Sequence, residues 1–208
     1  MAENVSPTAF ADAFVPEDDA VEQAVEAALR LGCEPVSPAT GMALALAAAG
    51  GAVSSMVEIG TGTGVSGLWL LKGAPRAQLT TIDHDLDRHQ AAKVAFAAAG
   101  HAGRAVRFIT GRAAEVLPRM NEGAYDLVLV DADAEPVADY VDTALTLVRP
   151  GGSVLVARVL QQGKVAIPAR RDRRTTVYRD LLKSMRDRDD LLAGLSPVGD
   201  GLLHLVRR

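Results

Sequence analysis

The sequence predicts an α/β fold built on a doubly wound, mostly parallel β-sheet, with helices on both faces and an antiparallel hairpin at the C-terminal end. Short runs of Val, Ile and Leu, such as YDLVLV at 125–130, alternate with segments of helical periodicity. Such continuous apolar strands are typical of a parallel sheet, and right-handed crossovers wind it in both directions. A glycine-rich loop, VEIGTGTGVSG at 57–67, directly follows the first strand. The length of 208 residues suits one domain of this class.

The N-terminal part of the chain is predicted to be mainly helical. We expect residues 1–15 to be a disordered tail and residues 16–208 to form a single domain that begins with helices. Proline and glycine bound a first amphipathic helix at 16–32. A Ser-Pro pair at 37–38 is typical of a capped helix start, so a second helix is expected at 39–49.

Strands and helices then alternate up to the C-terminal hairpin. Ligands of parallel sheets bind at the carboxyl ends of the strands. Gly60, Asp83 and Asp131 are predicted at such ends, so they should border one cleft. The strands are expected at 55–59, 79–82, 105–110, 125–130 and 153–157; the helices from the glycine loop to 71 and at 86–99, 113–120, 136–148 and 175–192; and the hairpin turn at 199–201.

The composition favours a cytoplasmic protein without a membrane partner. A single cysteine, Cys33, allows neither an intramolecular disulfide nor a cysteine-based zinc site. No apolar stretch has the length of a membrane span. The first twenty residues carry acidic but no basic side chains, unlike a signal peptide.

The net charge of −4 conceals a basic segment at 164–188. This segment holds nine basic and three acidic residues, a charge of +6, which leaves −10 for the remainder. Its arginines would suit a phosphate-bearing ligand such as a CoA thioester. Nucleic acid is not expected as a partner, because Tyr178 is the single aromatic residue among these charges. A solvated helix face with a disordered loop is the alternative.

The glycine loop is expected to hold a ligand. An ATP-binding P-loop needs Lys after its last glycine, but Gly67 is followed by Leu and Trp. Gly62, Gly64 and Gly67, with Asp83 about 20 residues on, also fit dinucleotide binding, so an NAD-dependent oxidoreductase is an alternative. Glu58 disfavours that alternative, because a carboxylate beside a pyrophosphate is unfavourable. The same carboxylate suits a ligand with a cationic sulfonium and an ammonium group.

Several segments follow one another in a characteristic order and spacing. They are VEIGTGTGVSGLWL, LTTIDHD, GRAAEVLP, YDLVLVDAD, VRPGGSVLV and PVGDGL, with PVSPATG upstream. Together they resemble the cation-dependent O-methyltransferases of the catechol and caffeoyl-CoA type, over roughly residues 30–208. The resemblance implies a Rossmann-like class I methyltransferase sheet. It also implies S-adenosylmethionine as cofactor and a small-molecule methyl acceptor.

The resemblance implies cofactor-binding roles for twelve residues. Asp83 would accept hydrogen bonds from both ribose hydroxyls, and Ser66 would cap the following helix and contact the cofactor. From the residues alone, other roles stay open: Asp83 or Asp133 as a helix cap, Ser66 as a structural residue, and the glycines as a tight turn. The remaining implied residues are Glu58, Gly60, Thr61, Gly62 and Gly64 around the methionine part, His84 and Ala113 against the adenine, Val36 in the covering segment, and the acidic pair Asp131 and Asp133.

The resemblance also implies a divalent metal, and here the sequence departs from the family. Asp131 matches the first metal ligand, but Ala157 and Arg158 stand where the family has an Asp-Asn pair. Ala134 replaces the lysine that assists as base. Because a guanidinium repels cations, we expect no metal and an ion pair between Arg158 and Asp131 in its place. Both are candidate catalytic residues, with Asp131 or His84 as the base; a surface or dimer ion pair is the alternative for Arg158.

Three functions therefore compete. The favoured one is methylation of a phenolic or acyl-CoA-like small molecule with S-adenosylmethionine. An NAD-dependent oxidoreductase and a non-catalytic S-adenosylmethionine-binding protein are the alternatives. A homodimer is expected, because the resembled family commonly dimerises and the N-terminal helices can cover a neighbouring chain.

Overall fold

A seven-stranded sheet forms the centre of the computed structural model, which describes residues 6–208 except 102 and 133. The strand order is β3-β2-β1-β4-β5-β7-β6. The first five strands pair in parallel, whereas β7 is antiparallel to β5 and to β6. The predicted fold class is therefore confirmed. The strands are β1 Ser55–Ile59, β2 Gln78–Asp83, β3 Val106–Thr110, β4 Tyr125–Val130, β5 Val148–Ala157, β6 Leu191–Ser196 and β7 Leu202–Arg207.

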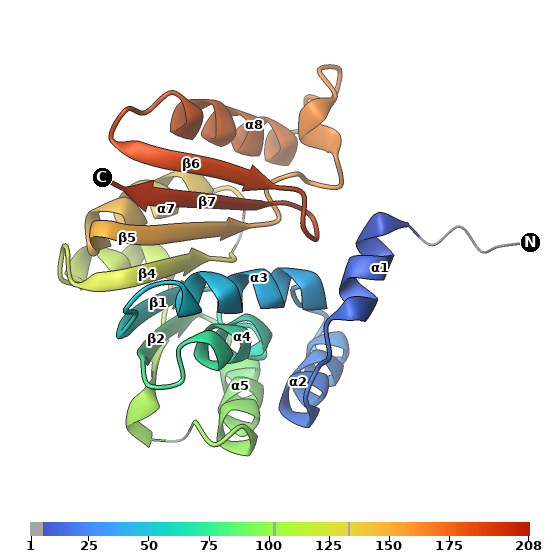
Figure 1. Cartoon of the computed structure of the whole chain (residues 1–208), viewed down its shortest axis with the longest axis vertical. Helices are drawn as coiled ribbons and strands as arrows, with labels where there is room; N and C mark the ends of the chain where they lie inside the picture. The colour runs from blue at the N-terminus through green and yellow to red at the C-terminus, as the bar shows by residue number, and fades with distance from the viewer. Residues whose placement is uncertain (1–5, 102, 133) are drawn as a thin grey trace, which may run out of the picture.

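Helices cover both faces of this sheet (Figure 1). Met56 of β1 packs into a core with α3, α4 and α5, while the next residue, Val57, packs into a second core with α6, α7 and α8. Both side chains are buried, and each such burial contributes about 1.5–3 kcal/mol. The helices are α1 Pro7–Phe14, α2 Asp19–Arg30, α3 Pro38–Ala49, α4 Val65–Gly73, α5 Leu86–Ala98, α6 Ala113–Val116, α7 Val137–Leu147 and α8 Arg173–Arg186.

The N-terminal region differs from the expectation of a disordered tail at 1–15. Residues 7–14 form α1, and residues 1–5 lie outside the described part of the chain. The Ser6 side chain accepts a hydrogen bond from the Ala9 N–H, the usual cap of a helix start. Asp12 accepts a hydrogen bond from the Ala39 N–H at 3.0 Å, which fixes α1 to the start of α3.

Two helices start at other residues than predicted, because side chains cap them there. The first long helix begins at Asp19 rather than at 16, because Asp18 accepts a hydrogen bond from the Val21 N–H. The last helix begins at Arg173, because Asp172 binds both the backbone N–H and the hydroxyl of Thr175.

Two predicted helix ends were wrong. The helix predicted at 175–192 stops at Arg186, and β6 takes up residues 191–196 because they pair with β7. The helix predicted at 113–120 becomes a single α-turn followed by a 3-10 turn at 117–119, which contains Pro118. Proline lacks the N–H that would continue an α-helix.

Candidate active site

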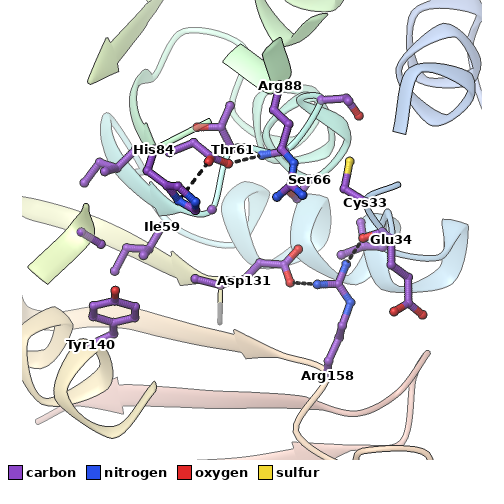
Figure 2. A pocket seen from close by; sticks show the side chains of 18 of the residues that line it. Cys33, Glu34, Ile59, Thr61, Ser66, His84, Arg88, Asp131, Tyr140 and Arg158 are labelled. Carbon is purple, nitrogen blue, oxygen red and sulfur yellow. Dashed lines mark hydrogen bonds and ion pairs between the residues drawn. The ribbon is translucent and has the colours of Figure 1, made fainter. Parts of the chain in front are cut away.

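A cavity of about 760 Å³ opens at the carboxyl ends of the parallel strands, where ligand sites of such sheets occur. Gly60, Asp83 and Asp131 all line it, which confirms that they border one cleft. Figure 2 shows Arg158 pointing from the chain after β5 toward Asp131 at this cavity. The other predicted site residues that line it are Val36, Thr61, Gly62, Ser66, His84, Ala113 and Arg158.

Three predicted residues are not among those described as lining the cavity. Asp133 lies outside the described residues. Gly64 caps α4 with a φ of +95°, and a Cβ there would lie 3.1 Å from the ring of Phe96. Gly64, not Ser66, is therefore the cap of this helix, which corrects the sequence-based expectation. Glu58 is fully buried beneath the loop.

The glycine loop forms a backbone wall of the cavity. Gly60 has a φ of +94°, and a Cβ at this position would lie 2.1 Å from the Asp131 carbonyl oxygen. Only glycine therefore allows the ends of β1 and β4 to approach this closely. The Gly60 N–H donates to the Ile82 carbonyl and the Asp131 N–H to the Ile59 carbonyl, each at 2.9 Å, so hydrogen bonds fix the three strand ends together.

Asp83 presents a fixed carboxylate at the end of β2. One oxygen accepts a hydrogen bond from the Gly62 N–H at 2.9 Å, and the other accepts one from the Asp85 N–H at 3.0 Å. The following helix is capped by Asp85, which accepts from the Asp87 and Arg88 N–H groups. The alternative role of Asp83 as a helix cap is therefore wrong. Each carboxylate oxygen keeps a second acceptor position.

Glu58 lies directly under the glycine loop. Its carboxylate accepts hydrogen bonds from the hydroxyls of Ser66 at 2.7 Å and Thr81 at 2.6 Å. Burial raises the pKa of Glu58 to about 8, although these two hydrogen bonds favour the ionised form. The nearby carboxylates of Asp83 and Asp131 raise the pKa further.

Sequence reasoning missed a buried histidine behind the same loop. His89 of α5 is 1% exposed, and its Nε2 lies 3.1 Å from the Thr61 hydroxyl. Its Nδ1 lies 2.9 Å from the hydroxyl of Thr110. The Thr61 hydroxyl is also 2.6 Å from that of Thr81. Glu58 is thus connected to His89 by hydroxyl groups. A helical histidine carries no sequence signal for such a contact.

Arg158 joins three distant segments at the wall of the cavity. Its guanidinium forms an ion pair with Asp131 and donates a hydrogen bond to the carbonyl oxygen of Glu34 (Figure 2). The expected Arg158–Asp131 pair is therefore present. Arg158 has a φ of +59°, a left-handed conformation uncommon for a side chain of this size. Burial raises the pKa of Asp131, and the guanidinium opposes this by stabilising the carboxylate.

The residues at this position do not fit a divalent metal. Arg158 occupies the side of Asp131 where further oxygen ligands would be needed, and the adjacent Ala157 supplies none. Within 6–101, 103–132 and 134–208, no cluster of three or more His, Cys, Asp or Glu residues has metal-binding geometry.

The cavity also has a lining that the sequence did not predict. Tyr140 of α7 contributes a phenol ring and Arg174 of α8 a guanidinium, whereas Cys33 and Glu34 come from the chain between α2 and α3. Tyr140 and Arg174 lie on helices that also carry exposed polar residues. The sequence does not distinguish the polar residues that face the cavity from those that face solvent. Only the packing of α7 and α8 over the sheet selects these two residues.

Comparison with known proteins identifies the class of protein that this fold and loop define. Residues 19–208 match the family model described as O-methyltransferase. A provisionally assigned O-methyltransferase of Mycobacterium avium (strain 104) is 40% identical over 203 residues, which cover 97% of this chain and 91% of that protein. The chain belongs to the O-methyltransferase family, whose members use S-adenosylmethionine.

Solved structures agree with this assignment. The O-methyltransferase TomG of Streptomyces achromogenes, involved in tomaymycin synthesis and solved with S-adenosylmethionine, has a TM-score of 0.85 and 30% identity. The match covers 95% of this chain and 93% of that one. An O-methyltransferase of Bacillus cereus, solved with S-adenosylhomocysteine, has a TM-score of 0.84 and 25% identity, with 95% and 94% covered. No helix in the described part of this chain is long and apolar enough to cross a membrane.

Proposed function

We propose that this chain binds S-adenosylmethionine in the cavity and transfers its methyl group to an oxygen atom of a small acceptor. The observation that carries the proposal is the side-chain-free wall at Gly60 beside the fixed carboxylate of Asp83, which suits a nucleoside with two vicinal hydroxyls. When bound, S-adenosylmethionine supplies a methyl group on a cationic sulfur. The residues assigned to it are Val36, Glu58, Gly60, Thr61, Gly62, Gly64, Ser66, Asp83, His84, Ala113, Asp131 and Asp133.

We assign catalytic roles to Asp131 and Arg158. The Asp131 carboxylate takes the proton of the acceptor hydroxyl, and the Arg158 guanidinium holds the resulting oxyanion. Asp131 would keep that proton and Arg158 would hold the acceptor oxygen, while the bound cofactor would supply the methyl group by displacement at its cationic sulfur. Positioning the oxygen in line with the sulfonium is the main requirement of this displacement.

The acceptor in this proposal is a phenolic or acyl-CoA-like molecule that carries an additional anionic group. Arg174 supports this, because it lines the cavity and belongs to the basic segment 164–188. Arginine binds carboxylates and phosphates through two parallel hydrogen bonds. Family membership does not favour the NAD-dependent oxidoreductase.

Calorimetry followed by a methyl-transfer assay tests the proposed function. S-adenosylmethionine and NAD are titrated separately into the protein, and methyl transfer is then measured on phenols with and without a carboxylate or phosphate, in EDTA. Binding of S-adenosylmethionine and turnover in EDTA are expected. Binding of NAD alone would reject the proposal. Cofactor binding without turnover of any acceptor would favour the non-catalytic alternative.

We also propose that residues 16–208 act as one methyltransferase domain, that the protein is a cytoplasmic homodimer, and that it uses no divalent metal. The single cysteine supports the location, and the Arg158–Asp131 ion pair supports the absence of a metal requirement. Exposed apolar residues on the N-terminal helices support the dimer, among them Phe10 and Phe14.

A further inference from the structure

We propose that a directional chain of hydrogen bonds through Thr61 and Thr81 couples the tautomer of His89 to the proton on Glu58. The inference rests on the proposed binding of S-adenosylmethionine in this cavity. The chain of contacts itself is a property of the protein without its cofactor.

The number of hydrogens that each group can donate fixes the direction of this hydrogen-bond chain. A threonine hydroxyl has one hydrogen to donate. With Glu58 ionised, Thr81 donates to the carboxylate at 2.6 Å, so Thr61 must donate to Thr81. Thr61 can then only accept from His89, which fixes the proton on Nε2. The Nδ1 atom of His89 accepts from Thr110.

A proton on the Glu58 oxygen that faces Thr81 reverses every donor. Glu58 then donates to Thr81, Thr81 to Thr61, and Thr61 to Nε2 of His89. The histidine must therefore carry its proton on Nδ1 and donate it to Thr110. Both arrangements satisfy all buried groups, and partly satisfied buried networks are costly. The chain thus has two complete states that differ by one proton.

The geometry also provides a route for that proton. Glu58, Thr61, Thr81 and His89 are each at most 1% exposed, whereas Thr110 is exposed at the end of β3. When Glu58 ionises, each hydroxyl passes one hydrogen along the chain. His89 gains a proton on Nε2 and loses one from Nδ1 through Thr110 to water. One proton leaves the protein, and His89 stays neutral in both states.

The charged surroundings determine when the switch occurs. Asp83 and Asp131 face Glu58 and oppose its ionisation, whereas the hydroxyls of Ser66 and Thr81 and the start of α4 favour it. Asp83, Asp85 and Lys93 act on His89, and burial lowers its pKa, so the neutral imidazole is maintained. A cation bound in the cavity shifts this balance toward ionised Glu58.

Thr61 and Ser66 connect the hydrogen-bond chain to the proposed cofactor cavity. Both side chains belong to the network, both residues line the cavity, and Figure 2 labels both there. Because S-adenosylmethionine carries a sulfonium, its binding should release the Glu58 proton. S-adenosylhomocysteine lacks this charge and should release fewer protons. The affinity for S-adenosylmethionine should therefore rise with pH, with about a tenfold limit per pH unit for one proton.

The first experiment reads the tautomer of His89 by NMR in the cofactor-free protein with ¹⁵N-labelled imidazoles. The His89 signals are assigned by their loss in His89→Gln. The proton is expected on Nδ1 at about pH 6 and on Nε2 at about pH 9, because the pKa of Glu58 is raised to about 8. Thr81→Val should abolish this pH-dependent change of the His89 tautomer, and Thr81→Ser should restore it. A single tautomer throughout, or an unaltered change in Thr81→Val, would overturn the inference.

The second experiment measures proton release by calorimetry of S-adenosylmethionine binding in buffers of different ionisation enthalpy. About one proton per bound cofactor is expected at about pH 7, and none in Glu58→Gln. His204→Gln is the matched control, because His204 also contacts a hydroxyl, that of Ser153 at 2.9 Å, but on the far strands β5 and β7. This variant should retain the release.

The two experiments separate the possible failures. Binding without proton release would overturn the inference and leave the proposed function intact. No binding of S-adenosylmethionine would overturn the proposed function, while the NMR result would still decide whether the chain has two states. If Glu58→Gln does not fold, the Thr81→Val and Thr81→Ser pair provides the same comparison.

Discussion

At the scale of single residues, Asp83 gives the most direct test of the cofactor site. Asp83→Ala removes a carboxylate whose two oxygens are held by the Gly62 and Asp85 N–H groups. Hydrogen bonds to a charged group contribute about 1.5–3 kcal/mol, so the affinity for S-adenosylmethionine should fall by more than about tenfold. Calorimetry measures this, with His204→Gln as the control. Unchanged affinity would show that Asp83 does not bind the ribose.

Arg158 allows the proposed chemistry to be separated from cofactor binding. Arg158→Ala leaves Asp131 without its cation and removes the group that would hold the acceptor oxyanion. We expect kcat to fall by about 10²–10³, with S-adenosylmethionine affinity changed much less, because the ribose and loop contacts are elsewhere. Single-turnover kinetics and calorimetry measure the two quantities.

Metal dependence is the control for this prediction. Activity of the unaltered protein should survive EDTA, because a guanidinium about 5 Å from a divalent ion opposes its binding by roughly 6–7 kcal/mol before screening. Activity lost in EDTA and restored by Mg²⁺ would contradict the assignment of Arg158.

The sequence was informative about residues whose type alone indicates their chemistry. Gly60, Asp83 and Asp131 follow apolar strands, so their meeting at one edge could be predicted. The link between Thr61 and His89 could not, because 28 positions separate them and neither residue type points to the other. Such a contact depends on how α5 packs against the glycine loop, and packing is not visible in local sequence.

At the scale of secondary-structure elements, Asp126 of β4 connects three strands at the edge opposite the cavity. Its carboxylate accepts hydrogen bonds from the backbone N–H of Ser54, just before β1, and from that of Ser55, the first residue of β1. It also accepts a hydrogen bond from the Arg149 side chain of β5. Burial alone would raise the pKa of Asp126, but these donors lower it to about 2. Asp126 therefore fixes the register of β1, β4 and β5.

The low pKa of Asp126 predicts an acid-sensitive contribution to stability. Because the folded-state pKa lies below the unfolded value, the contribution is present above about pH 4 and is lost as the pH falls toward about 2. Asp126→Asn should lower the free energy of unfolding by about 2–3 kcal/mol near neutral pH and by much less at about pH 2. Urea unfolding measures this. Asp142→Asn is the exposed control, and an equal loss at both pH values would contradict the prediction.

Element boundaries were predictable where the local signal was strong. YDLVLV became β4 with the predicted ends, because an uninterrupted apolar strand has few other places to pack. Residues 7–14 and 191–192 were assigned wrongly. The helix α1 depends on Asp12 contacting α3, and β6 depends on pairing with β7. Both elements are stabilised by partners distant in the chain.

At the scale of the whole molecule, the proposed dimer can be tested through α1. Phe10 and Phe14 are 68% and 79% exposed, and α1 buries none of its residues within this chain. We expect light scattering at micromolar concentration to give the mass of a dimer, and Phe10→Ser with Phe14→Ser to shift it toward the monomer, because the apolar contact area is lost. Leu195→Ser on β6 is the control. A monomer mass for the unaltered protein would refute the dimer.

The close approach of Gly60 to Asp131 also limits how this protein can evolve. A side chain at position 60 would collide with the backbone after β4, so no substitution there can be tolerated by a small local adjustment. Arg158, in contrast, follows β5, where a new side chain would change the proposed acceptor half of the cavity and leave the glycine loop untouched. If the proposed roles hold, descendants of this sequence can acquire new acceptors through changes after β5 and in α8 while they inherit the proposed nucleoside pocket unchanged.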